Sequence, residues 1–268
     1  ELARLTGGVG NNVIDASAFA GGTTLAGGAG NDTMRGGAGA DVLIGGAGDD
    51  SMDGGGGTSD TADFSSAPGP KGVKASLASG TAKGDGKKDV LANIENLTGS
   101  PFPDTLTGSA LANRLDGGDG NDKLNGGLGN DILLGGVGND SLTDTSGRNL
   151  LIGGLGADKF KAGGDGDILI GGRTIHDAID AALGAIMAEW TATRVVPVTP
   201  ADYTQRVNNL RDGSGGAALN GGTFLNNATV LDDAIADRFT GGAGFDLFFS
   251  VAGEKSDRLV GTEVNGLP

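Results

Sequence analysis

The chain has 268 residues, of which 55 are glycine and only 4% are aromatic, and this is too little apolar bulk for conventional cores of that length. Its 34 acidic and 19 basic residues give a formal net charge of -15, which argues against nucleic acid and anionic membrane surfaces as partners and favours cations. There is no cysteine and no apolar stretch near the roughly 18 residues of a membrane span, which excludes disulfides, thiolate chemistry and membrane insertion.

Residues 1–60 are predicted to form a first repeat array with an N-terminal cap. The string G-G-x-G-x-D begins at Gly27, Gly36 and Gly45, and the nine-residue step continues to Gly54. We expect six residues of turn and then three of strand in each unit, with the apolar side chain at position eight pointing inward. Two units make a coil of 18 residues, and stacked coils make two parallel sheets. The turn at 7–12 lacks its acid and is interpreted as the cap.

Residues 61–89 are predicted to interrupt the array with one strand and a turn, because the nonapeptide is lost there. The second array is expected over 90–172. Its units keep the nine-residue step without slippage from Gly117 to Gly171. Across both arrays the apolar residues at position eight are Met34, Leu43, Met52, Leu115, Leu124, Leu133, Leu142, Leu151, Phe160 and Leu169.

Residues 173–222 are predicted to form a helical insertion or cap. Apolar residues from Ile175 to Trp190 recur at helical spacing, and Thr174 and Asp177 are placed as a capping box, so a helix is expected over 175–190. A second helix signal runs from Thr199 to the stop at Gly213. We expect these apolar faces to cover the end or side of the coils, the alternative being a ligand or partner site. Residues 223–268 are predicted to return to the coils and end in a C-terminal cap.

The unit at 126–134, with the sequence G-G-L-G-N-D-I-L-L, resembles the hemolysin-type calcium-binding repeat family, also called RTX. This resemblance covers about 27–60 and 90–172 and returns at 232–249. It implies a bacterial protein secreted to the extracellular space or cell surface, which folds when external calcium binds between turns. The predicted fold class is all-β, a right-handed parallel β-roll solenoid with a small helical insertion near the C-terminus. The region 153–260 also resembles large extracellular proteins of planctomycete-type bacteria.

Several calcium ions are the expected cofactor, because carboxylates and turn carbonyls together make oxygen-only sites. Glycine permits positive φ, so that turn carbonyls can converge with the acid. The predicted carboxylate ligands are Asp32, Asp41, Asp50, Asp60, Asp104, Asp122, Asp131, Asp140, Asp158 and Asp167. The glycines predicted to shape the sites are Gly118, Gly120, Gly127, Gly129, Gly136, Gly138, Gly154 and Gly156.

The sixth positions form two columns at 18-residue spacing. One contains Asp104, Asp122, Asp140 and Asp158, and the other contains Glu95, Asn113, Asp131, Asn149 and Asp167. Weaker or absent ions are expected where an asparagine contributes a neutral oxygen, and the prolines just before Asp104 argue against a regular site in that turn. Asp41 is expected to lie near Asp60, because the unit between them has gained a residue. Asp237 and Asp246 are expected on opposite sides.

The sequence predicts a binding or structural role and no enzyme. Its one histidine, His176, excludes a His-Glu-x-x-His zinc helix in this chain, and no G-x-S-x-G elbow is present. The leading hypothesis is a calcium-binding extracellular module for a surface, adhesion or scaffold role, with other cell-surface proteins as partners. The alternatives are a subunit of a calcium-dependent filament or surface layer, which would bind copies of itself, and the C-terminal calcium domain of a secreted hydrolase or toxin.

Overall fold

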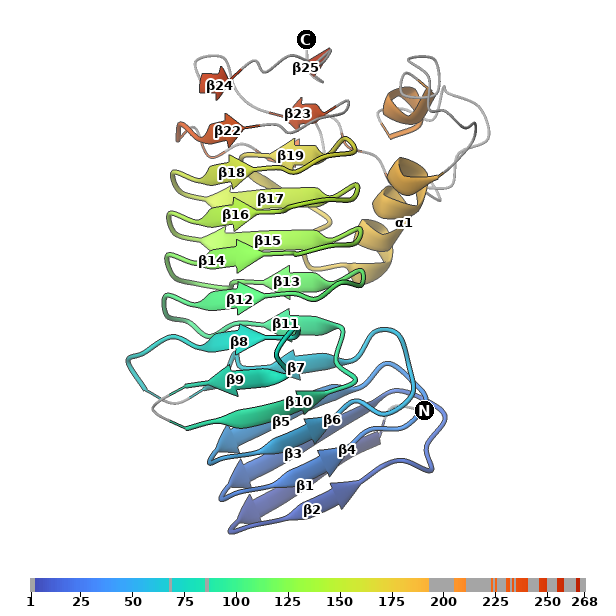
Figure 1. The fold of residues 1–268 in the computed structure, drawn as a ribbon, viewed down its shortest axis with the longest axis vertical. Helices are drawn as coiled ribbons and strands as arrows, with labels where there is room; N and C mark the ends of the chain where they lie inside the picture. The colour runs from blue at the N-terminus through green and yellow to red at the C-terminus, as the bar shows by residue number, and fades with distance from the viewer. Residues whose placement is uncertain are drawn as a thin grey trace. The chain divides into compact units, whose positions relative to one another are not determined.

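The computed structural model describes residues 3–67, 69–84, 87–192, 205–210, 223, 225, 230–231, 233, 235–240, 246–249, 255–257 and 264–265. The chain forms two compact units, residues 1–127 and residues 128–268. Each unit is a parallel β-solenoid, in which short strands alternate between two sheets (Figure 1). The all-β solenoid that the sequence predicts is therefore confirmed.

In the first unit, one sheet has the order β1-β3-β5-β7-β11-β13 and the other has the order β2-β4-β6-β10-β9-β8-β12-β14. Successive strands of a sheet pair one coil apart, as in the register of Met34 with Met52. The strands are β1 (Ala3–Val9), β2 (Val13–Asp15), β3 (Thr23–Ala29), β4 (Thr33–Arg35), β5 (Val42–Ala47), β6 (Ser51–Asp53), β7 (Thr61–Asp63), β8 (Lys74–Ser76), β9 (Thr81–Lys83), β10 (Asp89–Ala92), β11 (Asn96–Thr98), β12 (Thr105–Thr107), β13 (Arg114–Asp116) and β14 (Lys123–Asn125).

The interruption at 61–89 contains more structure than one strand and a turn. Strand β9 pairs antiparallel with both β8 and β10, so a small hairpin is inserted into an otherwise parallel sheet. Strand β10 then pairs parallel with β6, and β11 pairs parallel with β7, so both sheets continue after the insertion. Strand β9 could not be predicted from the sequence, because its three residues, T-A-K, are too few to show a periodic pattern of apolar residues.

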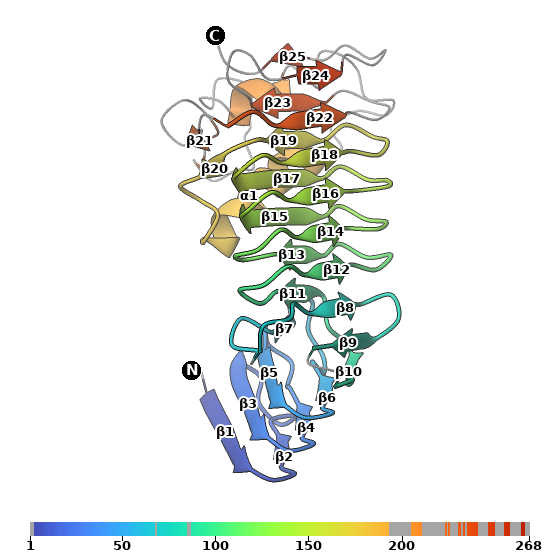
Figure 2. The ribbon, with the colours of Figure 1, turned by 90° about the vertical axis from the view of Figure 1, so that its left-hand side faces the viewer.

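In the second unit, the two solenoid sheets have the orders β15-β17-β19-β23-β25 and β16-β18-β22-β24 (Figure 2). Strands β20 and β21 form a separate antiparallel pair. The strands are β15 (Ile132–Val137), β16 (Ser141–Thr143), β17 (Leu150–Leu155), β18 (Lys159–Lys161), β19 (Ile168–Ile170), β20 (Arg173–Thr174), β21 (Val230–Leu231), β22 (Arg238–Thr240), β23 (Leu247–Phe249), β24 (Lys255–Asp257) and β25 (Val264–Asn265).

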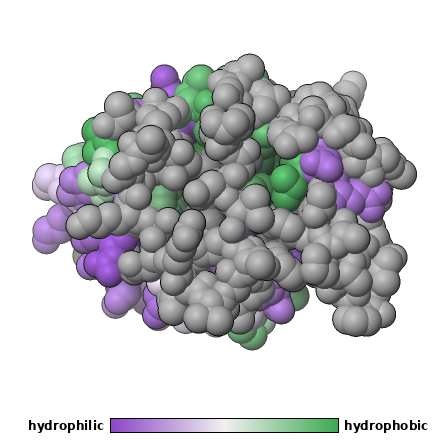
Figure 3. All heavy atoms as spheres, turned by 90° about the horizontal axis from the view of Figure 1, so that it is seen from above, coloured by the Kyte–Doolittle hydropathy of each residue, from purple (hydrophilic) through white to green (hydrophobic). Residues whose placement is uncertain are grey.

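The side chains at position eight form the core between the two sheets of each unit. All ten that the sequence predicts to point inward are at most 2% exposed, from Met34 to Leu169. In the second unit Phe160 and Phe239 stack with ring centroids 4.7 Å apart, which extends this core beyond the last regular repeat. In the view from above, many of the hydrophilic residues that can be seen lie at the left-hand rim, around the coils (Figure 3).

The helix α1 (Asp180–Thr191) covers one side of the second unit (Figure 1). Its buried residues Leu183, Ile186 and Trp190 join a cluster with outward-facing residues of β15, β17 and β19, such as Ile152 and Ile168. This outer cluster explains why those strands are apolar on both faces.

The helix begins five residues later than the sequence predicts. Thr174 and Asp177 do bond to each other, the Thr174 hydroxyl donating to Asp177 Oδ1 at 2.6 Å, but they close an isolated turn that precedes α1. Ile175 and Ile179 are consequently about half exposed and do not belong to the buried face. Of the second predicted helix, residues 205–210 are described and are helical; Tyr203 and Gly213 lie outside the described residues. No helix in the described part of the chain is long and apolar enough to cross a membrane.

Candidate metal sites

A ladder of carboxylates connects neighbouring coils in the first unit. The backbone N–H of Asp32 donates to Oδ1 of Asp50 at 2.8 Å, and the N–H of Asp50 donates to Oδ1 of Asp89 at 3.0 Å. On the other side, the N–H of Asp41 donates to Oδ1 of Asp60 at 2.8 Å, which places these two residues together as expected. Each acid thus uses one oxygen to bind the turn of the preceding coil.

The second unit repeats this arrangement. The N–H of Asp140 donates to Oδ1 of Asp158 at 2.7 Å, and the N–H of Asp158 donates to Oδ1 of Asp237 at 2.6 Å. In the other column the N–H of Asn149 donates to Oδ1 of Asp167, and the N–H of Asp167 donates to Oδ1 of Asp246, both at 2.8 Å. Asp237 and Asp246 therefore lie in different columns, although they are only nine residues apart.

The second oxygen of several column acids is buried and accepts no hydrogen bond. This holds for Oδ2 of Asp32, Asp50, Asp60, Asp158 and Asp167, all at most 2% exposed. A buried carboxylate oxygen without a donor is costly unless a cation neutralises it. These atoms are therefore what a hard, oxygen-seeking cation requires.

Asp41 and Asp104 differ from the other acids because both of their oxygens are hydrogen-bonded. Oδ2 of Asp41 accepts from the N–H of Gly37, and Oδ1 accepts from Thr23. Oδ2 of Asp104 accepts from the N–H of Ser100, whose hydroxyl donates to Oδ1. Their predicted role in metal binding has less support from the structure. Of the remaining predicted ligands, Asp122 accepts from the N–H of Asp104 through Oδ1, and Asp131 donates its N–H to Asn149.

The turn glycines bring carbonyl oxygens close to the acids. All eight glycines predicted at the sites have positive φ, from 88° at Gly118 to 141° at Gly120 and Gly138. The first glycine of a unit faces the acid of its own turn. A Cβ on Gly45 would lie 2.6 Å from Oδ2 of Asp50, and one on Gly27 would meet Oδ2 of Asp32 and lie 2.7 Å from the carbonyl oxygen of Gly45. Carboxylate and carbonyl oxygens of successive coils thus converge beside a backbone that only glycine fits.

Backbone oxygens are needed for these sites. In the described part of the chain, no group of three or more His, Asp or Glu side chains is arranged to hold a metal ion by itself. Columns of one or two carboxylates per turn, supplemented by carbonyls, fit the six to eight oxygen ligands of calcium.

Burial raises the pKa of several column acids, and neighbouring acids raise it further. The pKa of Asp158 rises to about 8 because the side chain is buried and lies near Asp140 and Asp237. The pKa of Asp167 also rises to about 8, through burial and then through Asp246 and Asp144. In the first unit, burial raises the pKa of Asp60 and of Asp89 to about 6. The columns thus resist full ionisation in the absence of a cation.

Three aspartates of the columns were not among the predicted ligands. Asp89 follows Asp50 after 39 residues, and Asp237 and Asp246 follow Asp158 and Asp167 after 79 residues. The search for partners 18 residues apart cannot find them, because excursions of the chain separate the coils. Their common signal is an acid two residues before an inward-facing apolar residue, as in Asp237 and Phe239.

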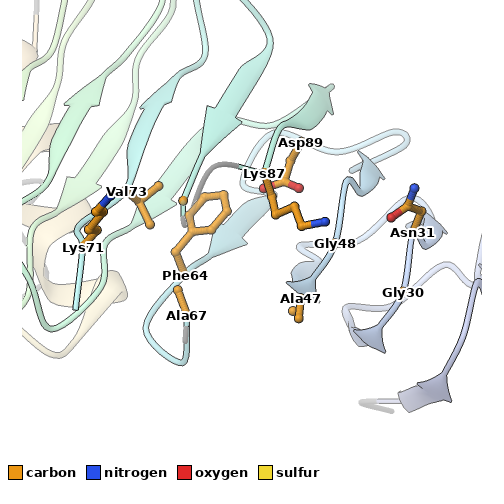
Figure 4. A pocket seen from close by; sticks show the side chains of 12 residues that line it. Gly30, Asn31, Ala47, Gly48, Phe64, Ala67, Lys71, Val73, Lys87 and Asp89 are labelled. Carbon is orange, nitrogen blue, oxygen red and sulfur yellow. The ribbon is translucent and has the colours of Figure 1, made fainter. Parts of the chain in front are cut away.

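A separate pocket of about 390 Å³ lies in the first unit, beside the inserted hairpin. Figure 4 shows the side chains of Lys87 and Asp89 together at this pocket, with Phe64 between Lys71 and Lys87. Asp89 also belongs to the acid column, so the pocket borders that column.

The comparison with known families agrees with this geometry. The profile of the RTX calcium-binding nonapeptide repeat matches residues 26–59, 107–142 and 143–173. No curated protein matches the chain. The resemblance to planctomycete proteins remains a prediction.

Proposed function

We propose that this RTX-type repeat protein is a structural module that folds on calcium after secretion and serves a surface, adhesion or scaffold role outside the cell. The observation that carries the proposal is the set of buried Oδ2 atoms without hydrogen-bond donors, repeated from coil to coil in both units. Calcium bound there supplies the positive charge that the columns lack. The glycine-rich turns supply carbonyl oxygens, and the acids join one coil to the next through Oδ1.

The proposal treats calcium as part of the fold. Stacked strands lie about 4.8 Å apart, so that ionised acids in successive coils repel each other. The thin core at position eight contributes mainly small and medium-sized side chains, such as Leu133 and Ala62. A ligand that binds only the native state stabilises that state by mass action. The calcium concentration outside a cell therefore favours folding there.

Far-ultraviolet circular dichroism during a calcium titration tests this proposal. We expect the calcium-free protein at pH 7.5 to lose most of its β signal and to regain it when calcium, but not an equal ionic strength of sodium, is added. A spectrum that is the same in excess EGTA and in calcium rules out the proposed role of the ion.

A second candidate is self-assembly into a filament or surface layer. In the described residues β1 and β2 are the first strands of the two sheets, and Val9 of β1 and Val13 of β2 are 95% and 81% exposed. Another copy could continue the sheet there by a head-to-tail contact that does not close. Sedimentation in calcium distinguishes the candidates, since a concentration-independent monomer contradicts the filament.

We propose a binding role and no catalysis for this chain. The one histidine, His176, lies in the turn before α1, where its backbone N–H donates to the Thr174 hydroxyl at 3.0 Å. The columns account for the buried acids. The alternative, that the chain is the calcium-binding part of a larger secreted hydrolase or toxin, is tested by the sequence of the intact gene product.

A further inference from the structure

The turn at 144–149 carries its acid in an unusual place. Its sequence is D-T-S-G-R-N, so that Asp144 stands at position one, where the adjacent units have Gly135 and Gly153, and Asn149 stands at position six. In those adjacent units, a Cβ at position one would meet the Oδ2 of the sixth-position acid, Asp140 or Asp158. A side chain at position one therefore projects toward the sixth position of its own turn, which for Asp144 is Asn149, in the column that contains Asp131 and Asp167.

The environment of Asp144 shows that its carboxylate is directed into this column. The side chain is 2% exposed, and its Oδ2 is buried without a hydrogen-bond partner. The side chains of Asp131 and Asn149 lie close enough to influence its carboxyl group, and Asp144 in turn affects Asp167 electrostatically.

A local turn does not explain this burial. Oδ1 of Asp144 accepts from the N–H of Ser146 at 3.0 Å. Asp15, Asp53 and Asp63 make the same bond to the residue two positions on, but they stand at position nine and none of them is buried. Only the placement at position one brings the second carboxylate oxygen inside.

We infer that Asp144 is a calcium ligand that replaces the carboxylate missing at Asn149, so that Asp131 and Asp144 together supply the charge of one site in the second unit. This inference rests on the proposed calcium binding. A regular pair of turns offers two carboxylates, such as Asp140 and Asp158. The pair Asp131 and Asn149 offers one, and Asp144 restores the count to two. The site expected to be weak or absent because of Asn149 is therefore assigned a full charge.

The test is calcium binding by the full chain, measured by equilibrium dialysis and isothermal titration calorimetry at pH 7.5. D144N keeps the shape of the side chain and its bond to Ser146 but removes the charge. We expect it to bind one ion fewer than the wild type, or to bind one ion about tenfold more weakly, because ligand charge tunes calcium affinity. D63N is the matched control, since Asp63 makes the same local bond outside the columns, and its binding is expected to equal that of the wild type.

A second comparison keeps the inference testable if D144N folds poorly. D144G/N149D gives this turn the regular glycine and acid, and D144G alone gives it the glycine without an acid. We expect the double variant to bind one more ion, or one ion about tenfold more tightly, than D144G. Equal binding by D144N and the wild type overturns the inference, and so does equal binding by D144G and the double variant. The inference also fails if Asp131 and Asp144 only share a proton and bind no ion. A wild type that binds no calcium at all contradicts the proposed function instead.

Discussion

The backbone N–H of Asp140 donates to Oδ1 of Asp158 at 2.7 Å, while Oδ2 of Asp158 is buried and accepts no hydrogen bond. The two oxygens of the Asp158 carboxylate thus have different roles. Its first oxygen fixes the spacing of neighbouring coils, and its second oxygen is available to a cation.

Replacement of Asp158 by asparagine is expected to change stability in opposite directions with and without calcium. In calcium, D158N should melt at a lower temperature and bind calcium about tenfold or more weakly at one site, because a ligand charge is lost. In calcium-free buffer at pH 7.5, where the wild type is expected to lose most of its β signal, D158N should retain more of that signal, because burial and the nearby acids make the ionised Asp158 unfavourable there. Thermal melts in calcium and far-ultraviolet circular dichroism in calcium-free buffer measure this, with D165N at an exposed position as the control. A destabilised variant in both buffers contradicts the prediction.

The calcium-free protein is expected to become less stable as the pH rises from about 4 to 8. The folded-state pKa values of Asp60 and Asp89 are raised to about 6, and those of Asp158 and Asp167 to about 8, from an ordinary value of 3.8. Between these limits the folded state binds more protons than the unfolded state, so the stability present at low pH is lost as these groups ionise. Far-ultraviolet circular dichroism of the calcium-depleted protein, followed from pH 5 to pH 8, measures the loss of folded protein. Saturating calcium should remove or reverse the trend, since the ion binds the ionised acids.

Alanine at Gly46 should destabilise the first unit, whereas alanine at Gly8 should not. Both are second glycines of their turns, but Gly46 has φ of 96° and a Cβ there would collide with the carbonyl oxygen of Gly28. Gly8 has no atom within 4 Å of that point and no positive φ. The loss for G46A is expected to exceed about 1 kcal/mol, measured by urea denaturation in calcium. Equal losses in the two variants would show that the stacking of turns does not set the requirement for glycine.

Leu133 tests the contribution of the core at position eight. It is fully buried between the sheets of the second unit, so L133A should lose about 2–5 kcal/mol of unfolding free energy in calcium. Leu128, in the turn of the same nonapeptide, is 52% exposed, and L128A should lose less than about 0.5 kcal/mol. A small loss for L133A would mean that the bound ions alone support the coils.

Fluorescence of Trp190, the single tryptophan of the sequence, should report the binding of calcium to the second unit. Its Nε1 donates to the carbonyl oxygen of Gly166 at 2.9 Å, one residue before Asp167, and the ring is 1% exposed. Removal of calcium should shift the emission to longer wavelength as the ring meets water. D167N should require more calcium for the blue shift, and D63N should not. A Trp190 emission maximum that does not change with calcium contradicts the coupling between α1 and the turn that contains Asp167.

The sequence predicts the solenoid and its core because both depend on a local period. Position eight can be found by counting in nines, and Leu97 and Leu115 pair one coil apart as counting suggests. The columns follow from the same count as long as the chain does not leave the coils. Asp50 and Asp89 could not be paired in this way, since the length of an excursion is not encoded in the period.

Asp144 and the start of α1 show a second limit. The repeat normally has glycine at position one, so a search for acids at sixth positions does not find a carboxylate there. The capping box at Thr174 and Asp177 is a local signal, and local signals predict a turn more reliably than they predict the next element of the chain. The predicted apolar face of the helix is confirmed from Leu183 to Trp190, because these side chains pack on the solenoid.

The inserted hairpin of the first unit has a practical consequence for protein engineering. The chain departs after β7 and comes back at β10, and the ladder bond between Asp50 and Asp89 differs little in length from that between Asp32 and Asp50. Added loop length has only a modest entropic cost. Foreign peptides exchanged for the tip between β9 and β10 are therefore expected to be displayed on a scaffold that, if the proposed role of calcium holds, folds when a simple salt is added.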